Sequence, residues 1–302
     1  MEIEIDEKYD GITVLQILKK ELHLSSKMIS SLKRRDNGIT VSGKHVTVRK
    51  TVSYGDILSI EVEDTEDNEN LVKTEMPLDI IYEDDEIILV NKPPMLPTHP
   101  SHGHFDDTLA NGVAFHMRNQ PFVFRAVNRL DRNTSGLVLI AKNRLSASRL
   151  YSSMQKGDIC KEYIALLCGV PCERDGRIDT YIRRKEASII TREVCGKLSD
   201  SSRAITDYST LVHNGKISVV SAKPITGRTH QLRLHFAYIG TPIIGDDLYG
   251  TTDTEFNINR QALHAVRLTF PHPITKEKMV FSAPIPLDMK EIIIKNDLKI
   301  EV

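Results

Sequence analysis

Residues 127–137 read VNRLDRNTSGL, where a charged loop leads directly into a strongly apolar stretch. Asp131 is the only acidic residue from Arg125 to Arg149, and six cations lie in the same segment. These cations are Arg125, Arg129, Arg132, Lys142, Arg144 and Arg149. Arginine neighbours favour the ionised form of a carboxylate, and an ionised carboxylate can act as a nucleophile. An aspartate that caps a turn would give the same pattern, and charge alone slightly favours that structural interpretation.

The flanking sequence predicts an α+β domain over residues 78–290, built on a mixed, mostly antiparallel β-sheet. Apolar stretches of strand length recur along it, at residues 80–82, 86–90, 137–141, 163–167, 206–212, 217–223, 263–269 and 279–283. Helices are expected at residues 144–155 and 229–239, since the second has Leu232 and Phe236 at helical spacing.

Residues 11–62 form a second predicted unit, two short helices followed by a hairpin, with Ser25 and Ser26 as caps of the second helix. Nine basic residues stand against two acids between residues 11 and 50. Such a concentration is expected of a protein that binds a polyanion, although a solvated helix face would look alike. The acidic stretch 63–77 predicts a linker between the two domains.

The composition of the whole chain argues against several classes of protein. The 302 residues carry a net charge of −1, and no apolar stretch approaches the roughly 20 residues of a membrane span. The acidic first residues differ from a signal peptide, so a cytoplasmic protein without a membrane partner is expected. Four cysteines suggest neither a disulfide framework nor a zinc site. His99, His102 and His104 lack the partners of a metal-ligand set, and no glycine-rich phosphate-binding loop is present.

The stretch 127–137 resembles the signature of RluA-type pseudouridine synthases, in which His or Asn precedes Arg-Leu-Asp and Thr-Ser-Gly follows. Further stretches resemble that family's other motifs in the same order, at residues 81–93, 161–165, 224–235, 242–250 and 263–265. Residues 11–62 resemble an S4-like RNA-binding domain, which is usual in the members that act on ribosomal RNA. Asn128 replaces the commoner histidine, and we expect this departure to bear on how Arg129 is held and little on activity.

The resemblance implies a role for each matching residue. Asp131 would be the catalytic aspartate, which attacks uridine either at the base or at the ribose C1′. Tyr163 would stack on the base and is a candidate for removing the C5 proton. Arg233 would pair with Asp131 and keep it charged and aimed. Arg129 would occupy the space that a flipped base leaves behind.

Other matching residues are expected to touch RNA or to support the loops. Arg228 and His230 would contact the RNA backbone or brace their loop. The basic run Lys33, Arg34 and Arg35 would lie at the end of the second helix and face phosphates. Asp246 and Tyr249 are expected to be structural, on general grounds of turn chemistry.

The resemblance therefore implies a monomeric isomerase that converts uridine to pseudouridine without a cofactor, with ribosomal RNA favoured over transfer RNA. A non-catalytic RNA-binding or ribosome-assembly factor is a second possibility, disfavoured because Asp131, Tyr163 and Arg233 are all present. A glycosidase is a third, but that chemistry needs two carboxylates about 5–10 Å apart, and the motif has one. The sequence does not identify the uridine.

Overall fold

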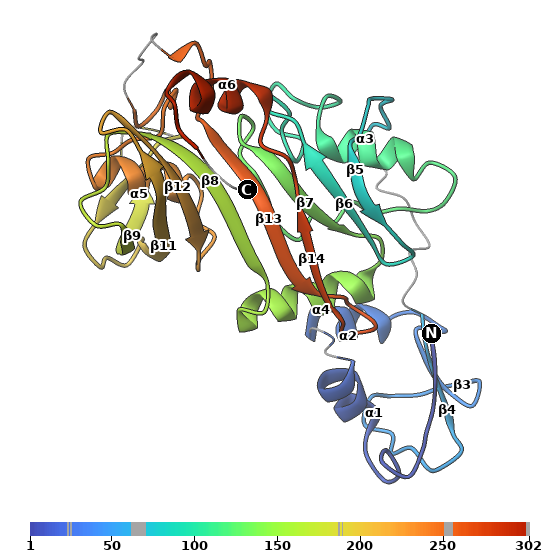
Figure 1. Cartoon of the computed structure of the whole chain (residues 1–302). Helices are drawn as coiled ribbons and strands as arrows, with labels where there is room; N and C mark the ends of the chain where they lie inside the picture. Colours follow the sequence, from blue (N-terminus) through green and yellow to red (C-terminus); the bar gives the residue numbers. More distant parts are fainter. Residues whose placement is uncertain are drawn as a thin grey trace.

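The protein consists of a small N-terminal domain at one end of a long, bent β-sheet (Figure 1). The structure is a computed structural model that describes residues 1–22, 24, 26–61, 71–186, 188, 190–250 and 256–299. The proposed cap Ser25 and residues 62–70, most of the predicted linker 63–77, lie outside the described residues. None of the helices in the described part combines the length and the apolarity needed to cross a bilayer.

The N-terminal domain packs short helical segments against a four-stranded sheet. Its elements are β1 (Glu2–Glu4), α1 (Val14–Gln16), the π-helix η1 (Ile17–Glu21), α2 (Ser26–Leu32), β2 (Ile39–Val41), β3 (Lys44–His45) and β4 (Ile57–Ile60). Thr13 and Gln16 form a capping box that starts α1. The predicted helices and hairpin are therefore present. Strand β1 pairs antiparallel with β4, so the sheet includes residues that precede the predicted domain start at residue 11.

The larger domain alternates strands with four helices among the described residues. Its elements are β5 (Ile80–Glu83), β6 (Ile87–Lys92), α3 (Leu109–His116), β7 (Ser135–Ala141), α4 (Arg144–Lys156), β8 (Cys160–Cys168), β9 (Asp175–Arg184), β10 (Arg192–Cys195), β11 (Ser202–His213), β12 (Ile217–Pro224), α5 (Gln231–Tyr238), β13 (Leu263–Pro271), β14 (Lys278–Ser282) and α6 (Leu287–Lys295). The strands form one sheet in the order β10-β9-β11-β12-β8-β13-β7-β6-β5, with β14 beside β13.

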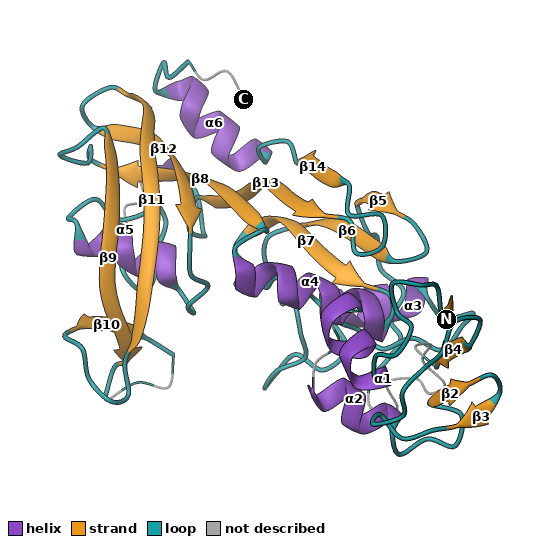
Figure 2. Cartoon of the chain, turned by 90° about the horizontal axis from the view of Figure 1, so that it is seen from below, coloured by secondary structure: helices purple, strands orange, loops and turns teal. Residues whose placement is uncertain are grey.

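The pairing in this sheet confirms the predicted fold class. Every described pair of strands is antiparallel except β13 with β7, which is parallel. Strands β9 and β10 are not among those predicted, because β9 buries only Ile178 and Ile182 and otherwise carries mostly polar residues. The end of the sheet that contains β9 and β11 bends away from β7 and β13, and α4 and α5 lie on the same side of it (Figure 2).

Strand β7 is buried along its whole length, which explains why its sequence is continuously apolar and does not alternate. Val138 and Ile140 belong to the hydrophobic cluster that includes α3. Leu137 and Leu139 belong to a second cluster, on the other face, that includes α4. The loop that precedes β7 is therefore attached to a strand that is packed on both faces.

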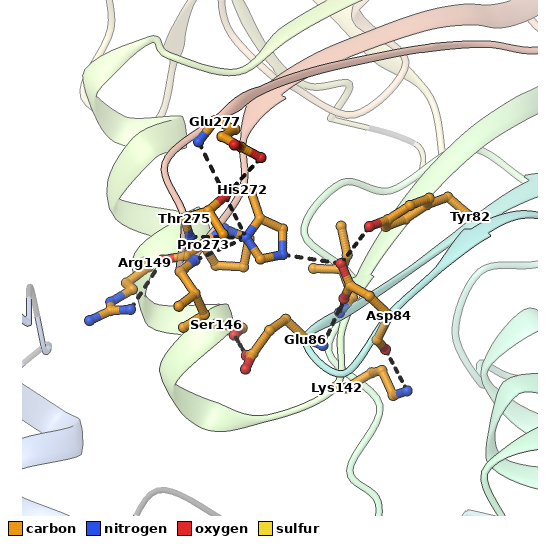
Figure 3. Close-up of polar contacts among 12 residues, drawn as sticks. Tyr82, Asp84, Glu86, Lys142, Ser146, Arg149, His272, Pro273, Thr275 and Glu277 are labelled. Atoms are coloured by element: carbon orange, nitrogen blue, oxygen red, sulfur yellow. Dashed lines mark hydrogen bonds and ion pairs between the residues drawn. The ribbon is translucent and has the colours of Figure 1, made fainter. Parts of the chain in front are cut away.

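Helix α4 contacts the N-terminal domain, the β5–β6 turn and the β13–β14 hairpin. Leu145 in its first turn is packed into the core of the N-terminal domain. Figure 3 shows its other contacts, where Arg149 donates to the carbonyl of Pro273 at 3.1 Å. His272 Nδ1 accepts backbone N–H groups, so Nε2 carries the proton and donates to Asp84 at 3.1 Å. This network ties the β5–β6 turn, α4 and the β13–β14 hairpin together.

Candidate active site

A cavity of about 410 Å³ opens between the loop before β7, strand β8 and the start of α5. Six residues predicted from the sequence line it: Arg129, Asp131, Tyr163, Arg228, His230 and Arg233. They come from three segments that are far apart in the chain, and the fold brings them to one place. Lys161, Thr226 and Gln231 also line the cavity and were not predicted.

Asp131 lies at the start of a tight turn at the edge of this cavity. Its backbone carbonyl accepts the N–H of Thr134 at 3.1 Å, and its side chain is partly exposed. On the preceding side, Thr98 Oγ1 donates to the carbonyl of Leu130 at 2.9 Å. The backbone around Asp131 is thus fixed by hydrogen bonds, while the carboxylate faces the cavity that it lines.

A buried lysine from β6 supports the same turn. Lys92 is 0% exposed, and its Nζ donates to the carbonyls of Pro93, Leu96 and Arg132 at 2.8–3.0 Å. Burial lowers the pKa of Lys92 to about 7, and the charge of Asp131 opposes this shift. The sequence does not predict these contacts of Lys92. Two of the carbonyls belong to the turn that follows it, and the third belongs to a loop 40 residues away.

Gly136 explains the Thr-Ser-Gly part of the motif. It pairs in parallel register with Ala265 of β13 at a φ of 115°. A Cβ on residue 136 would lie 2.3 Å from the carbonyl oxygen of Ala265, so only glycine fits without moving the strand. Thr134 is also anchored from this side, because its Oγ1 accepts a hydrogen bond from Gln261 at 3.0 Å.

Tyr163 is presented by β8 and is 7% exposed. Burial raises the pKa of its hydroxyl, and the negative charge of Asp131 raises it further. The side chain is therefore a neutral phenol at physiological pH. Tyr163 and Asp131 both line the cavity, and the aromatic ring of Tyr163 can serve as a flat surface on which a planar ligand stacks.

Arg233 lies on α5 and is 4% exposed. The sequence predicts that it pairs with Asp131, but its hydrogen bonds go to other carboxylates. Its Nε and Nη2 make a bidentate pair with Asp246 at 2.7 Å each, and Nη2 also reaches Asp247 at 2.9 Å. Burial lowers the pKa of Arg233, but the bonds to Asp246 and the nearby charges, Asp131 included, raise it overall. The positive charge of Arg233 therefore acts on Asp131 without a direct bond, and Asp246 fixes the direction of the guanidinium.

His230 caps the start of α5 in a left-handed conformation, with a φ of 57°. Tyr249 accepts the N–H of Arg192 at 2.8 Å, and its hydroxyl forms a hydrogen bond with His230 Nδ1 at 3.0 Å. Burial lowers the pKa of His230, while the charge of Asp131 raises it. Tyr249 thus links His230 to the backbone of Arg192 beside the cavity.

Comparison with known proteins identifies the family. Residues 86–238 match the family model described as RNA pseudouridylate synthase, and residues 1–58 match the N-terminal domain of RluD ribosomal pseudouridine synthase. The uncharacterized RNA pseudouridine synthase YjbO of Bacillus subtilis is 37% identical, over 90% of this chain and 95% of its own length. This chain belongs to the RNA pseudouridine synthase family.

Two further relatives support the assignment of the chain to these pseudouridine synthases. Ribosomal large subunit pseudouridine synthase D of Vibrio cholerae is 36% identical, over 87% of this chain and 85% of its own length. The solved structure of human RNA pseudouridylate synthase domain containing 1 is 28% identical, with a TM-score of 0.60, and covers 72% of this chain and 87% of that one. The predicted family is confirmed.

The remaining predicted site residues of this pseudouridine synthase lie on the N-terminal domain. Lys33 and Arg34 follow α2 and are exposed, and Arg34 Nε donates to the carbonyl of Ser30. Arg35 forms an ion pair with Glu61 at 3.6 Å. None of the three lines the cavity. Among the described residues no group of three potential metal ligands occurs.

Proposed function

We propose that this protein isomerises uridine to pseudouridine in large-subunit ribosomal RNA, with Asp131 as the covalent catalyst. The observation that carries the proposal is the position of Asp131 in a braced turn that opens into a cavity lined by Tyr163 and Arg233. A volume of about 410 Å³ lies in the range of sites that hold a molecule the size of a nucleotide.

The reaction needs a nucleophile but no external reactant. The C1′–N1 bond breaks, a C1′–C5 bond forms, the C5 proton leaves and N1 takes up a proton, so atoms and electrons balance within one nucleoside. The carboxylate of Asp131 can attack either the base or the ribose C1′, and either adduct frees the uracil to turn within the cavity. Because the overall change is an isomerisation, we expect the protein to act without a cofactor.

Arg233 and Tyr163 support this chemistry in different ways. Arg233 holds a positive charge near Asp131, and this charge attracts the carboxylate that attacks. Two hydrogen bonds to Asp246 hold the guanidinium of Arg233 in place, so it acts on Asp131 through its charge and not through a direct bond. The raised pKa of Tyr163 supports stacking on the uracil more than removal of the C5 proton, because a neutral phenol is a weak base.

The substrate must leave its RNA helix to reach Asp131, which is partly exposed at the cavity. Arg129 is exposed where it lines the cavity, and we propose that it fills the space that the flipped nucleotide leaves. Arg228 is exposed as well, and we propose that it contacts the RNA backbone while His230 braces its loop. Lys33 and Arg34 would add phosphate contacts from the N-terminal domain.

Ribosomal RNA is favoured as substrate because the Vibrio relative is named for the large ribosomal subunit and because the N-terminal domain matches that of RluD. We expect a cytoplasmic monomer. Pseudouridines should be mapped chemically in ribosomal and transfer RNA from cells that lack the gene. A pseudouridine lost from large-subunit RNA, and restored by the wild type but not by Asp131→Asn, is the expected result. A loss confined to transfer RNA would contradict the choice of substrate, and no loss would favour a non-catalytic RNA-binding factor.

A further inference from the structure

A buried arginine holds the turn that follows Asp131 from outside the cavity. Arg260 is 4% exposed, and its Nη1 donates to the carbonyl of Asn133, two residues after Asp131, at 3.3 Å. The same nitrogen reaches the carbonyls of Gln261 at 3.1 Å and Leu263 at 3.4 Å. Arg260 therefore links the turn to the start of β13.

The direction of this guanidinium is set by Asp288, in the first turn of α6. Arg260 Nε and Nη2 form a bidentate pair with the two carboxylate oxygens at 2.6 and 2.8 Å. Asp288 also accepts the N–H of Met289, and a negative charge near a helix N-terminus is favourable. Because Asp288 fixes Nε and Nη2 of the planar guanidinium, the remaining nitrogen, Nη1, points toward the turn.

Neighbouring contacts complete the support on this side. Gln261, next to Arg260, donates to Thr134, whose own N–H donates to the carbonyl of Asp131. Arg260 and Asp288 do not line the cavity, and both lie beyond residue 238, where the match to the family model ends. The part of the chain that carries this support is thus separate in sequence from the part that carries the signature.

We propose that Arg260, oriented by Asp288, is a positioning residue that keeps the carboxylate of Asp131 aimed into the cavity; this inference rests on the proposed function. A misplacement of about 1 Å in a reacting group can cost about 100-fold in rate, so bracing of the turn is a direct contribution to turnover. Helix α6 contributes through Asp288 although none of its residues lines the cavity.

The test uses Arg260→Lys and Asp288→Asn in the full chain. Lysine keeps the charge but loses the fork, and asparagine keeps the shape but loses the charge. We expect kcat for tritium release from C5-labelled ribosomal RNA to fall about 10- to 100-fold, with KM changed less than about twofold, because neither residue faces the RNA. Hydrogen exchange at the amide of Thr134 should become about 10-fold faster, since this bond closes the turn.

Arg149→Lys is the matched control. Arg149 is also buried, at 9% exposed, and it donates to a loop carbonyl, that of Pro273, which lies outside the cavity lining (Figure 3). Its variant should lose thermal stability to a similar extent, yet keep kcat within about twofold and leave Thr134 exchange unchanged. Full kcat or unchanged exchange in Arg260→Lys, or an equal loss of kcat in the control, would overturn the proposal. Absence of tritium release by the wild type would instead overturn the proposed function, and exchange would still decide whether Arg260 braces the turn.

Discussion

Cations of the same type lie in opposite surroundings at the two ends of this protein. On the N-terminal domain Lys33 and Arg34 are exposed, whereas Arg233 in the cavity is 4% exposed and bonded to Asp246 and Asp247. Exposed charges are screened by salt, while a buried guanidinium keeps a fixed geometry and its charge is screened much less. We therefore propose that the N-terminal domain attracts RNA and that the larger domain positions a single nucleotide.

The largest expected effect on stability comes from breaking the buried pair of Arg233 and Asp246. Asp246→Ala leaves Arg233 charged and without its bidentate partner in a buried place, which should destabilise the protein by about 3–5 kcal/mol. The kcat should fall as well, because the guanidinium near Asp131 is no longer directed. Urea denaturation gives the free energy of unfolding, and tritium release gives kcat.

An exposed pair provides the control for this prediction. Arg203 and Asp179 are also bidentate, at 2.5 and 2.9 Å, but the arginine is 57% exposed and solvent screens the pair. Asp179→Ala should cost only about 0–1 kcal/mol. Equal destabilisation by the two variants would show that burial does not distinguish them.

The next effect concerns pH and two buried histidines of the larger domain. Burial lowers the pKa of His235 and of His264 to about 4, from an ordinary value of 6.5. Between about pH 4 and 6.5 these two histidines bind protons in the unfolded chain but not in the folded protein. Their contribution to the free energy of unfolding is therefore fully present above pH 6.5 and is lost as the pH falls toward 4. Each histidine contributes a loss of roughly 3 kcal/mol at most. Urea denaturation at about pH 4.5 and about pH 7 should show this fall, and His235→Gln should reduce it; a flat profile would contradict the buried, neutral state.

The smallest effect is expected at the exposed cations. Changing both Lys33 and Arg34 to Gln should lower the salt dependence of RNA binding by roughly 0.7–0.9 in log–log slope for each phosphate that the variant no longer binds. Arg35→Gln should change the slope less, because Arg35 is already paired with Glu61. The kcat at saturating RNA should not change. Filter binding from about 50 to about 200 mM salt measures the slope, and an unchanged slope in the double variant would remove the N-terminal domain from the RNA interface.

The sequence predicts much of the fold because the decisive patterns are local. Residues 137–141 are continuously apolar, and β7 is buried on both faces. The stretches around Asp131, Tyr163 and Arg233 match the ordered motifs of the family, and the fold assembles them at one cavity. Strand β9 escapes prediction because polar residues dominate its pattern.

The contacts that hold the site are less predictable, because they join backbone atoms to distant side chains. Lys92 bonds three carbonyls, and any residue type at those positions would supply the same acceptors. The pairing of Arg233 with Asp246 depends on how the loop after α5 folds back over a separation of 13 residues. Motif resemblance therefore identifies which residues gather, and tertiary structure determines which of them bond.

The central claim is that Asp131 is the covalent catalyst, and its most direct test compares the wild type with Asp131→Asn. RNA labelled with tritium at uracil C5 should release tritium to water with the wild type. The variant keeps nearly the same size but has no nucleophilic carboxylate, so release should fall at least about 10⁴-fold while RNA affinity stays within a few-fold. Tritium release by Asp131→Asn at the wild-type rate would contradict the account.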